Sequence, residues 1–238
     1  MKKYDAIVIG AGHNGLTNAS YLAKAGLSVA VMERNPYIGG ATVSRELHDG
    51  WTYSNCSYVC SLLRPEITRD LQLPRHGLQV VPYGGGTTFM QNGDHYGSYH
   101  DHERQFREMA RHSNRDANAY ERYSADVLKQ TRLIRPFLLK TPPDPTSLKL
   151  RDLHDLADFA GAFLEMGEEG LADTIRFWTK SVADYLGEYF ETDVIKAHMA
   201  GSGIIGTALG VFSPGTAYVL LHHYMGEVDG NVGACGFA

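Results

Sequence analysis

The stretch AIVIGAGHNG, residues 6–15, decides the fold. Its first four residues are apolar and mostly β-branched, which is typical of a strand buried on both faces of a parallel sheet. The pattern over Asn14–Ala25 predicts a helix, and Gly26 is placed to end it in a left-handed cap. Ser28–Met32 predicts a second buried strand. A strand, a helix and a strand within about thirty residues predict a right-handed βαβ unit.

The glycines of this stretch have the spacing of a dinucleotide-binding turn. Gly10 permits the tight turn, Gly12 lets the backbone approach a pyrophosphate, and Gly15 lets helix and strand pack closely. The pyrophosphate is expected at the helix N-terminus, where free N–H groups and the helix dipole favour negative charge. Glu33 ends the second strand, at the distance expected of a ribose-binding carboxylate. The sequence therefore predicts nucleotide binding.

The residues that follow indicate which nucleotide is bound. Residues 33–42 read ERNPYIGGAT, which resembles the E-R-x(4)-G-G signature of FAD-dependent amine oxidases and phytoene dehydrogenases. GAGHNGL at residues 10–16 resembles the opening of phytoene-dehydrogenase-like FAD oxidoreductases. SNCSYVCSLLRPEI at residues 54–67 resembles the branch labelled pyridine nucleotide-disulphide oxidoreductase domain-containing. Glu33 disfavours NADP, whose 2′-phosphate requires a cation, although Arg34 beside it weakens that argument.

The resemblance implies FAD as the cofactor. The FAD contacts that it implies are Gly10, Ala11, Gly12, Asn14, Gly15, Glu33, Arg34, Gly39, Gly40, Ala41 and Thr42. Many relatives, amine oxidases especially, have arginine at the position of Ala41, so its absence favours the phytoene-dehydrogenase-like side over amine oxidation. The C-x(3)-C spacing of Cys56 and Cys60 gives no support to the disulphide in the branch name.

The expected fold class is α/β, a Rossmann-type βαβ unit with an inserted substrate domain. Residues 1–75 are expected to form the FAD-binding part, and residues 76–229 a small antiparallel sheet followed by helices. Residues 230–238 are interpreted as the start of a return to the FAD domain. The family fold adds further strands there, so we interpret the sequence as an N-terminal fragment, with an incomplete FAD domain and no activity on its own.

Shorter patterns predict the elements of this second domain. Short strands are predicted at 79–82, 87–91 and 95–99, and residues 36–75 are predicted to form loops and turns. Helices are predicted at 101–112 and 116–138, capped by Asp101 and Asp116, and then at 150–166, 171–190, 193–199 and 216–225.

Met199–Leu221 carries no charged residue, but it holds several glycines and Pro214. We interpret this segment as a buried, small-residue wall of a substrate cavity rather than as a membrane span. Peripheral membrane contact stays open. The segment suggests an apolar substrate.

Composition limits the remaining function classes. The chain has 22 basic and 27 acidic residues, a net charge of −5, which argues against a nucleic-acid partner. Three cysteines without a secretory signal indicate a reducing, cytoplasmic location, and all three are predicted to be small buried hydrophobes. The histidines near residues 95–102 lack metal-ligand spacing, so no metal site is predicted.

The predicted function is an FAD-dependent oxidoreductase of dehydrogenase or desaturase type, which transfers a hydride from a mostly apolar substrate to flavin. Because the flavin performs the redox chemistry, no side chain is singled out as catalytic. Two alternatives stay open: a non-catalytic binding protein similar to Rab GDP dissociation inhibitors, and an NAD-dependent dehydrogenase. The substrate, the electron acceptor and the oligomeric state are not predicted.

Overall fold

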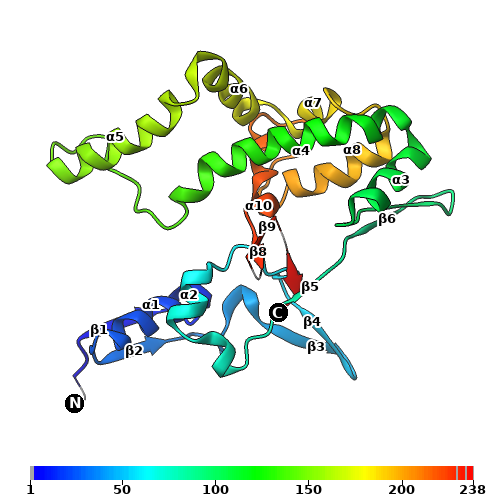
Figure 1. The fold of residues 1–238 in the computed structure, drawn as a ribbon. Helices are drawn as coiled ribbons and strands as arrows, with labels where there is room; N and C mark the ends of the chain where they lie inside the picture. The colour runs from blue at the N-terminus through cyan, green and yellow to red at the C-terminus, as the bar shows by residue number, and fades with distance from the viewer. Residues whose placement is uncertain (1–2, 229, 234, 238) are drawn as a thin grey trace. The chain divides into compact units, whose positions relative to one another are not determined.

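The computed structural model describes residues 3–228, 230–233 and 235–237. The chain divides into two compact units, which we describe separately (Figure 1). Unit 1 comprises residues 1–83 and 226–238, and unit 2 comprises residues 84–225.

Unit 1 begins with the predicted βαβ arrangement, which the structure confirms. Its elements are β1 (Ala6–Ile9), α1 (His13–Lys24), β2 (Val29–Met32), η1 (Gly40–Thr42), β3 (Ser44–His48), β4 (Trp51–Ser54), α2 (Pro65–Asp70), η2 (Leu73–His76), β5 (Val81–Pro82), β8 (Glu227–Val228), β9 (Asn231–Val232) and β10 (Gly236–Phe237). β1 and β2 pair in parallel, and α1 packs on both (Figure 1). Gly26, with φ +90°, ends α1 as predicted, because its N–H donates to Ala23 O and that of Leu27 donates to Leu22 O.

The expectation of loops between residues 36 and 75 is wrong. β3 and β4 form an antiparallel hairpin, and α2 follows it with Pro65 at its first position. The two strands are joined at Asp49-Gly50, and Gly50 has φ +79°. This dipeptide is a strong hairpin signal, since glycine tolerates the left-handed backbone that a tight turn needs.

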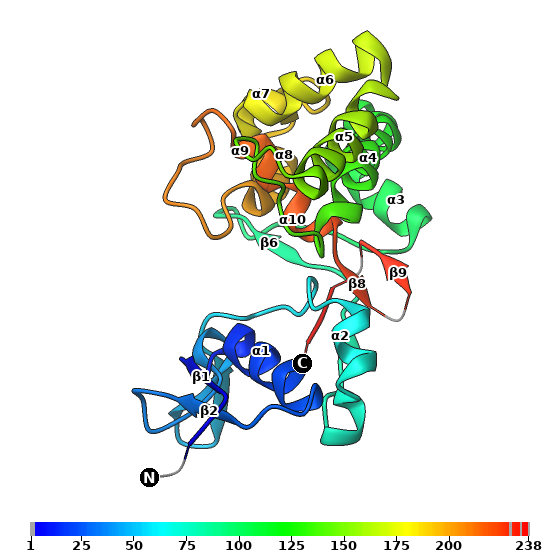
Figure 2. The same ribbon diagram turned by 90° about the vertical axis from the view of Figure 1, so that its left-hand side faces the viewer.

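Unit 2 holds one small hairpin and a set of helices (Figure 2). Its elements are β6 (Thr87–Phe89), β7 (His95–Gly97), α3 (His102–His112), α4 (Asn114–Ile134), η3 (Arg135–Phe137), α5 (Leu150–Leu164), α6 (Gly167–Thr179), α7 (Val182–Gly187), α8 (Asp193–Ala200), η4 (Gly201–Gly203), α9 (Thr216–Val219) and α10 (Leu221–Tyr224). Its fully buried large side chains include Tyr96, Met109, Tyr123, Val127, Leu186, Ile195, Leu220 and Leu221. Burying each such side chain contributes about 1.5–3 kcal/mol, so this core stabilises the helices.

Of the two predicted helix caps, the one of α3 is confirmed and the one of α4 is wrong. Asp101 caps α3 as predicted, because its carboxylate accepts the N–H of Arg104 at 2.7 Å. The prediction that Asp116 caps α4 is wrong, since Ser113 does so by accepting the N–H of Asp116 at 3.1 Å. The fully buried Asp116 instead accepts the backbone N–H groups of Glu191 and Thr192, at 2.8 and 2.9 Å.

The predicted single helix over residues 171–190 is two helices. α6 ends before Lys180, and α7 starts after Ser181, whose hydroxyl accepts the N–H of Asp184 at 3.0 Å. A serine side chain that caps a new helix ends the old one, although the apolar pattern continues through the break.

The prediction of a buried wall at Met199–Leu221 is wrong for its middle part. Residues 204–215 form a long loop (Figure 2), in which Leu209 is 50% and Phe212 is 80% exposed. Gly206 and Gly215 have positive φ, so the chain turns there instead of continuing a helix. In the part of the chain that the structure describes, no helix has the length and apolar character to cross a membrane.

Candidate functional site

The turn between β1 and α1 requires glycine at two places. Gly10 has φ +99°, and its N–H donates to Met32 O of the neighbouring strand at 2.7 Å. A Cβ added at Gly15 would lie 2.1 Å from Gly10 O, so any side chain there would push helix and strand apart. These two positions behave as the nucleotide-binding fingerprint predicts.

A second glycine segment packs on this turn, backbone against backbone. The N–H of Gly39 donates to Ala11 O at 2.8 Å, and Gly12 and Gly39 form a parallel bridge. Gly40 has φ +60°, and a Cβ on it would lie 2.9 Å from the Cα of Gly12. Residues far apart in sequence therefore form one surface of bare backbone, which is the kind of surface that a phosphate group can approach.

Glu33 is hydrogen bonded to the same turn. Its Oε2 accepts the N–H of Ala11 at 2.7 Å, and its Oε1 accepts the backbone N–H and the side-chain amide of Asn35, each at 2.9 Å. The backbone N–H of Asn35, followed by that of Ala11, lowers the pKa of the Glu33 carboxyl below its usual value. A carboxylate has about four lone-pair positions, so Glu33 can still accept a hydroxyl. Sequence reasoning missed Asn35, whose polar side chain next to the strand end was its only signal.

The N-terminus of α1 is open to an anion. Gly12 is the N-cap and offers no side-chain cap, and the first turn of the helix holds no acidic residue. The leading N–H groups and the positive end of the helix dipole are thus available to a phosphate. Among the other predicted contacts, Asn14, Arg34 and Ala41 are exposed, and the Thr42 hydroxyl donates to Gly39 O at 2.7 Å.

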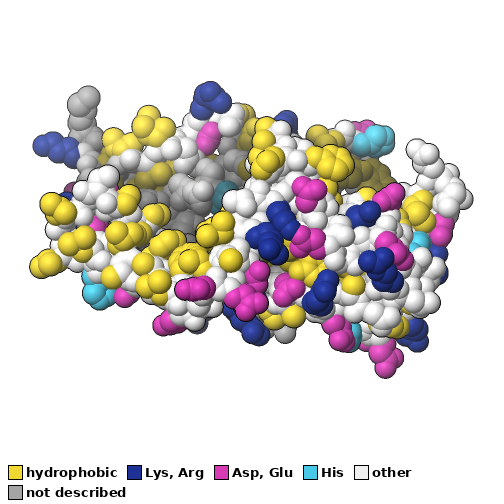
Figure 3. Space-filling view, turned by 90° about the horizontal axis from the view of Figure 1, so that it is seen from above, with side chains coloured by type: hydrophobic (Ala, Val, Ile, Leu, Met, Phe, Trp, Pro, Cys, Tyr) yellow, Lys and Arg dark blue, Asp and Glu magenta, His cyan; other side chains and the backbone are white. Residues whose placement is uncertain are grey.

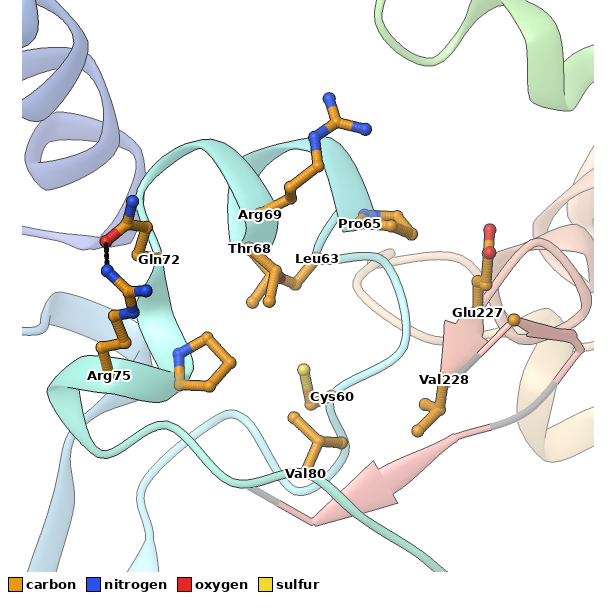
Figure 4. Close-up of a pocket in the computed structure, with 12 residues that line it drawn as sticks. Cys60, Leu63, Pro65, Thr68, Arg69, Gln72, Arg75, Val80, Glu227 and Val228 are labelled. Atoms are coloured by element: carbon orange, nitrogen blue, oxygen red, sulfur yellow. Dashed lines mark hydrogen bonds between the residues drawn. The ribbon is translucent and has the colours of Figure 1, made fainter.

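Unit 1 also contains a cavity of about 500 Å³ (Figure 4). Its apolar lining consists of Leu63, Pro65, Pro74, Val80 and Val228. Cys60 and Thr68 point into the space, whereas Arg69 points away from it and Arg75 donates to Gln72 at 2.8 Å (Figure 4). Burial raises the pKa of the Cys60 thiol, which is therefore a neutral lining group at neutral pH.

The histidine-rich segment and the cysteines are also candidate functional groups in the sequence. Asp94, in the histidine-rich segment, binds Arg111 at 2.7 Å, and among the described residues no group of three His, Cys, Asp or Glu could hold a metal ion. Cys235 is buried, as predicted, but Cys56 is exposed, which corrects the expectation that all three cysteines are buried. Cys56 lies just after the β3–β4 hairpin that sequence reasoning missed, and the residues of both strands are exposed like Cys56 itself.

Comparisons with known proteins agree with this geometry. Residues 8–69 match the family model described as NAD(P)-binding Rossmann-like domain. The pyridine nucleotide-disulfide oxidoreductase domain-containing protein 2 of Mus musculus is 36% identical over 99% of this chain and 43% of its own length. A putrescine oxidase triple mutant has the same fold over 92% of this chain and 41% of its own, with a TM-score of 0.52 at 19% identity. The chain belongs to an oxidoreductase family.

The name of a further relative states a substrate. This relative is a subunit of the limonene dehydrogenase of Castellaniella defragrans, 33% identical over 58% of the chain and 25% of its own length. The chain spans about 43% of the length of the mouse relative, so the activity, substrate and partners of a whole protein are proposals. The resemblance of residues 54–67 to the branch labelled pyridine nucleotide-disulphide oxidoreductase domain-containing is confirmed, and so is the Rossmann-type start of the chain.

Proposed function

We propose that this chain carries the FAD-binding part of an oxidoreductase of dehydrogenase or desaturase type. The observation that carries the proposal is the backbone contact between Gly12 and Gly40, beside the carboxylate of Glu33. A pyrophosphate needs a surface without side chains and with N–H donors, and an adenosine ribose needs a nearby acceptor. Both requirements fit the described residues. FAD, when bound, would supply the hydride acceptor.

The residues of the chain have separate roles in this proposal. The N–H groups of the first turn of α1 hold the pyrophosphate, and Glu33 accepts a ribose hydroxyl at its remaining lone pair. Gly39 and Gly40 keep the approach to the phosphates open. The exposed side chains of Asn14, Arg34 and Ala41 are proposed contacts at the rim.

The proposed substrate is mostly apolar. Five apolar side chains and the neutral Cys60 line the cavity of unit 1, together with the charged Arg69, Arg75 and Glu227. A related protein is named for limonene, which is a hydrocarbon.

The test is an absorbance spectrum of the protein made from the longest reading frame containing this chain, recorded before and after FAD is added. We expect a flavin spectrum in the parent and its loss in Gly12→Val. Gly12 has φ −73°, and a Cβ there would lie 3.9 Å from its nearest neighbour, so valine fits the chain and blocks only the phosphate approach.

The control is Gly210→Val, because Gly210 is exposed and an added Cβ meets nothing within 4 Å. It should keep the flavin spectrum. A folded parent protein that takes up NAD but no flavin would favour the NAD-dependent dehydrogenase. A folded parent that takes up neither nucleotide would favour a non-catalytic binding protein. Either result contradicts the proposal.

A further inference from the structure

The helix α5 has an apolar face that the described residues leave exposed. α5 lies at the edge of unit 2, where it packs on α6 (Figure 1). Two rings hold its inner face, since Phe159 packs edge to face on Phe137 at 4.9 Å and Phe163 on Trp178 at 5.6 Å. Even so, none of the 15 residues of α5 is buried.

The exposed apolar face follows a regular helical spacing. Its residues, which we call the α5 seam, are separated by alternate steps of three and four positions: Leu150, Leu153, Ala157, Ala160 and Leu164. Leu150 is 86% and Leu164 is 74% exposed. Such steps bring side chains onto one side of a helix, as in the a and d positions of a coiled coil. The spacing therefore indicates that the seam packs against another helix.

The charged side chains of α5 lie beside the seam and carry a net negative charge. They are one base and three acids: Arg151, Asp152, Asp155 and Asp158. Residues 159–164 read FAGAFL and hold no charge. A helix that is apolar all round is normally buried, so this part of α5 is suited to a protein partner. The excess of acids disfavours a lipid surface, because the membrane surfaces that attract proteins by charge are anionic.

The α5 seam is complementary in shape to a second copy of itself that runs antiparallel. A two-fold axis at Ala157 places Leu150 opposite Leu164 of the partner subunit. The same axis places Leu153 beside Gly161 of the partner subunit, where an added Cβ would meet nothing within 4 Å. The alanine on the axis lets the two helices approach closely. Each leucine thus meets a leucine or an open space, and one surface patch serves both subunits.

The charges at the two ends of α5 favour the antiparallel direction. Arg151, whose side chain is 84% exposed, follows the first residue of the helix, and Glu165 follows its last residue. An antiparallel pair brings Arg151 to the same end as Glu165 of the partner subunit, whereas a parallel pair brings like charges together. The helix dipoles are also opposed in the antiparallel pair. Charge and side-chain size therefore favour the same occupant, a second copy of this chain.

We propose that this protein forms a homodimer through the α5 seam, with the two helices antiparallel about a two-fold axis at Ala157. A helix of 15 residues is about 22 Å long, so one pair of them buries less than the about 1,200 Å² of a standard interface. The dimer should therefore dissociate on dilution. The seam belongs to unit 2, so the test does not depend on the nucleotide that unit 1 binds.

The test is analytical ultracentrifugation of the protein made from the longest reading frame containing this chain, at about 1 to about 100 μM. We expect a monomer at the lower and a dimer at the upper concentration. Gly161→Glu should weaken the dimer at least about tenfold, because it places a carboxylate in an apolar interface. Within one chain the new side chain meets open space, so Tm should not fall.

The matched control is Gly187→Glu. Gly187 is exposed on α7, and an added Cβ there also meets nothing within 4 Å. This variant should dimerise like the parent protein. A parent that stays monomeric at about 100 μM, or a dimer that Gly161→Glu does not weaken, overturns the proposal. A monomeric parent whose Tm falls in Gly161→Glu also overturns it, since another segment of the same protein would then cover the seam.

Cross-linking tests the antiparallel direction. In a Cys56→Ser background, which removes the exposed native thiol, a short bis-maleimide should join two copies of Ala157→Cys. It should not join two copies of Leu150→Cys, because these positions lie about 21 Å apart along the axis of an antiparallel pair. Cross-linking of Leu150→Cys without that of Ala157→Cys overturns the proposed arrangement.

Discussion

The core of unit 2 and the β1–β2 pair of unit 1 differ in the environment of their apolar side chains. In unit 2, Tyr123 and Val127 on α4 are fully buried. In unit 1, Ile9 and Met32, which are partners in the β1–β2 register, are 88% and 60% exposed. Both sets follow strong apolar patterns in the sequence. An apolar pattern therefore predicts that a segment is suited to burial. Only the tertiary structure shows whether other parts of the chain cover that segment.

Different interactions accordingly organise the two units. Unit 2 is held by side-chain burial, as in the ring cluster that Tyr123 forms with Tyr189, Phe190 and Tyr224. The glycine turn of unit 1 is held by hydrogen bonds to backbone and by glycine-to-glycine contact. Figure 3 shows one face of the molecule, on which apolar side chains gather over part of the surface and charged side chains of both signs over the rest. Mutations should distinguish stabilisation by side-chain burial from stabilisation by hydrogen bonds to the backbone.

The largest effect is expected for Tyr123→Ala. The substitution removes a fully buried ring and the hydrogen bond between its hydroxyl and that of Tyr224, at 3.0 Å. Leaving a cavity of this size should lower the free energy of unfolding by about 3–5 kcal/mol. Urea unfolding followed by circular dichroism measures it.

The matched change in unit 1 is Ile9→Thr, which alters a side chain that is 88% exposed. Its effect on the free energy of unfolding should stay within about 0.5 kcal/mol, as for most surface substitutions. A loss as large as that of Tyr123→Ala would mean that Ile9 is covered in solution, and the comparison between the units would fail.

A medium effect is expected for Asp116→Ala, which tests whether unit 2 also depends on a hydrogen bond inside its core. The substitution leaves the N–H groups of Glu191 and Thr192 without their acceptor. Losing two hydrogen bonds to a fully buried carboxylate should cost about 2–4 kcal/mol of unfolding free energy.

Asp193→Ala is the control for Asp116→Ala. Asp193 pairs with Lys196 at 2.9 Å, but its side chain is 98% exposed. Exposed pairs contribute about 0.2–1 kcal/mol. Equal losses in the two variants would show that burial of Asp116 adds nothing.

The sequence predicts the nucleotide-binding turn well, because each of its requirements is local. Positive φ at Gly10 and the close approach at Gly15 follow from a fixed spacing after a strand. The packing of Gly40 on Gly12 was indicated only by resemblance, since no local pattern states which distant segment will lie on a turn.

The failed predictions share one cause, which is that tertiary contacts decide between local alternatives. Ser113 and Asp116 are both good helix caps. Ser113 caps α4, because the Asp116 carboxylate instead accepts the backbone N–H of Glu191. The β3–β4 hairpin could have been predicted from Asp49-Gly50. The exposure of Phe212 could not, because burial depends on which elements are near enough to cover a loop.

The smallest effect is expected for the pKa of the Glu33 carboxyl in unit 1, which a titration measures. Asn35 and Ala11 hold the Glu33 carboxylate, so its pKa should lie below the ordinary value, and Asn35→Ala should raise it because one side-chain donor is lost. Since the folded state depresses this pKa, the contribution of Glu33 to stability is present above the unfolded pKa and is lost as pH falls through the folded one. NMR titration of the Glu33 side-chain carbonyl, whose signal is assigned by its loss in Glu33→Gln, measures the shift. An unchanged pKa in Asn35→Ala would mean that the N–H donors of the backbone alone organise the turn, which would sharpen the contrast with the side-chain core of unit 2.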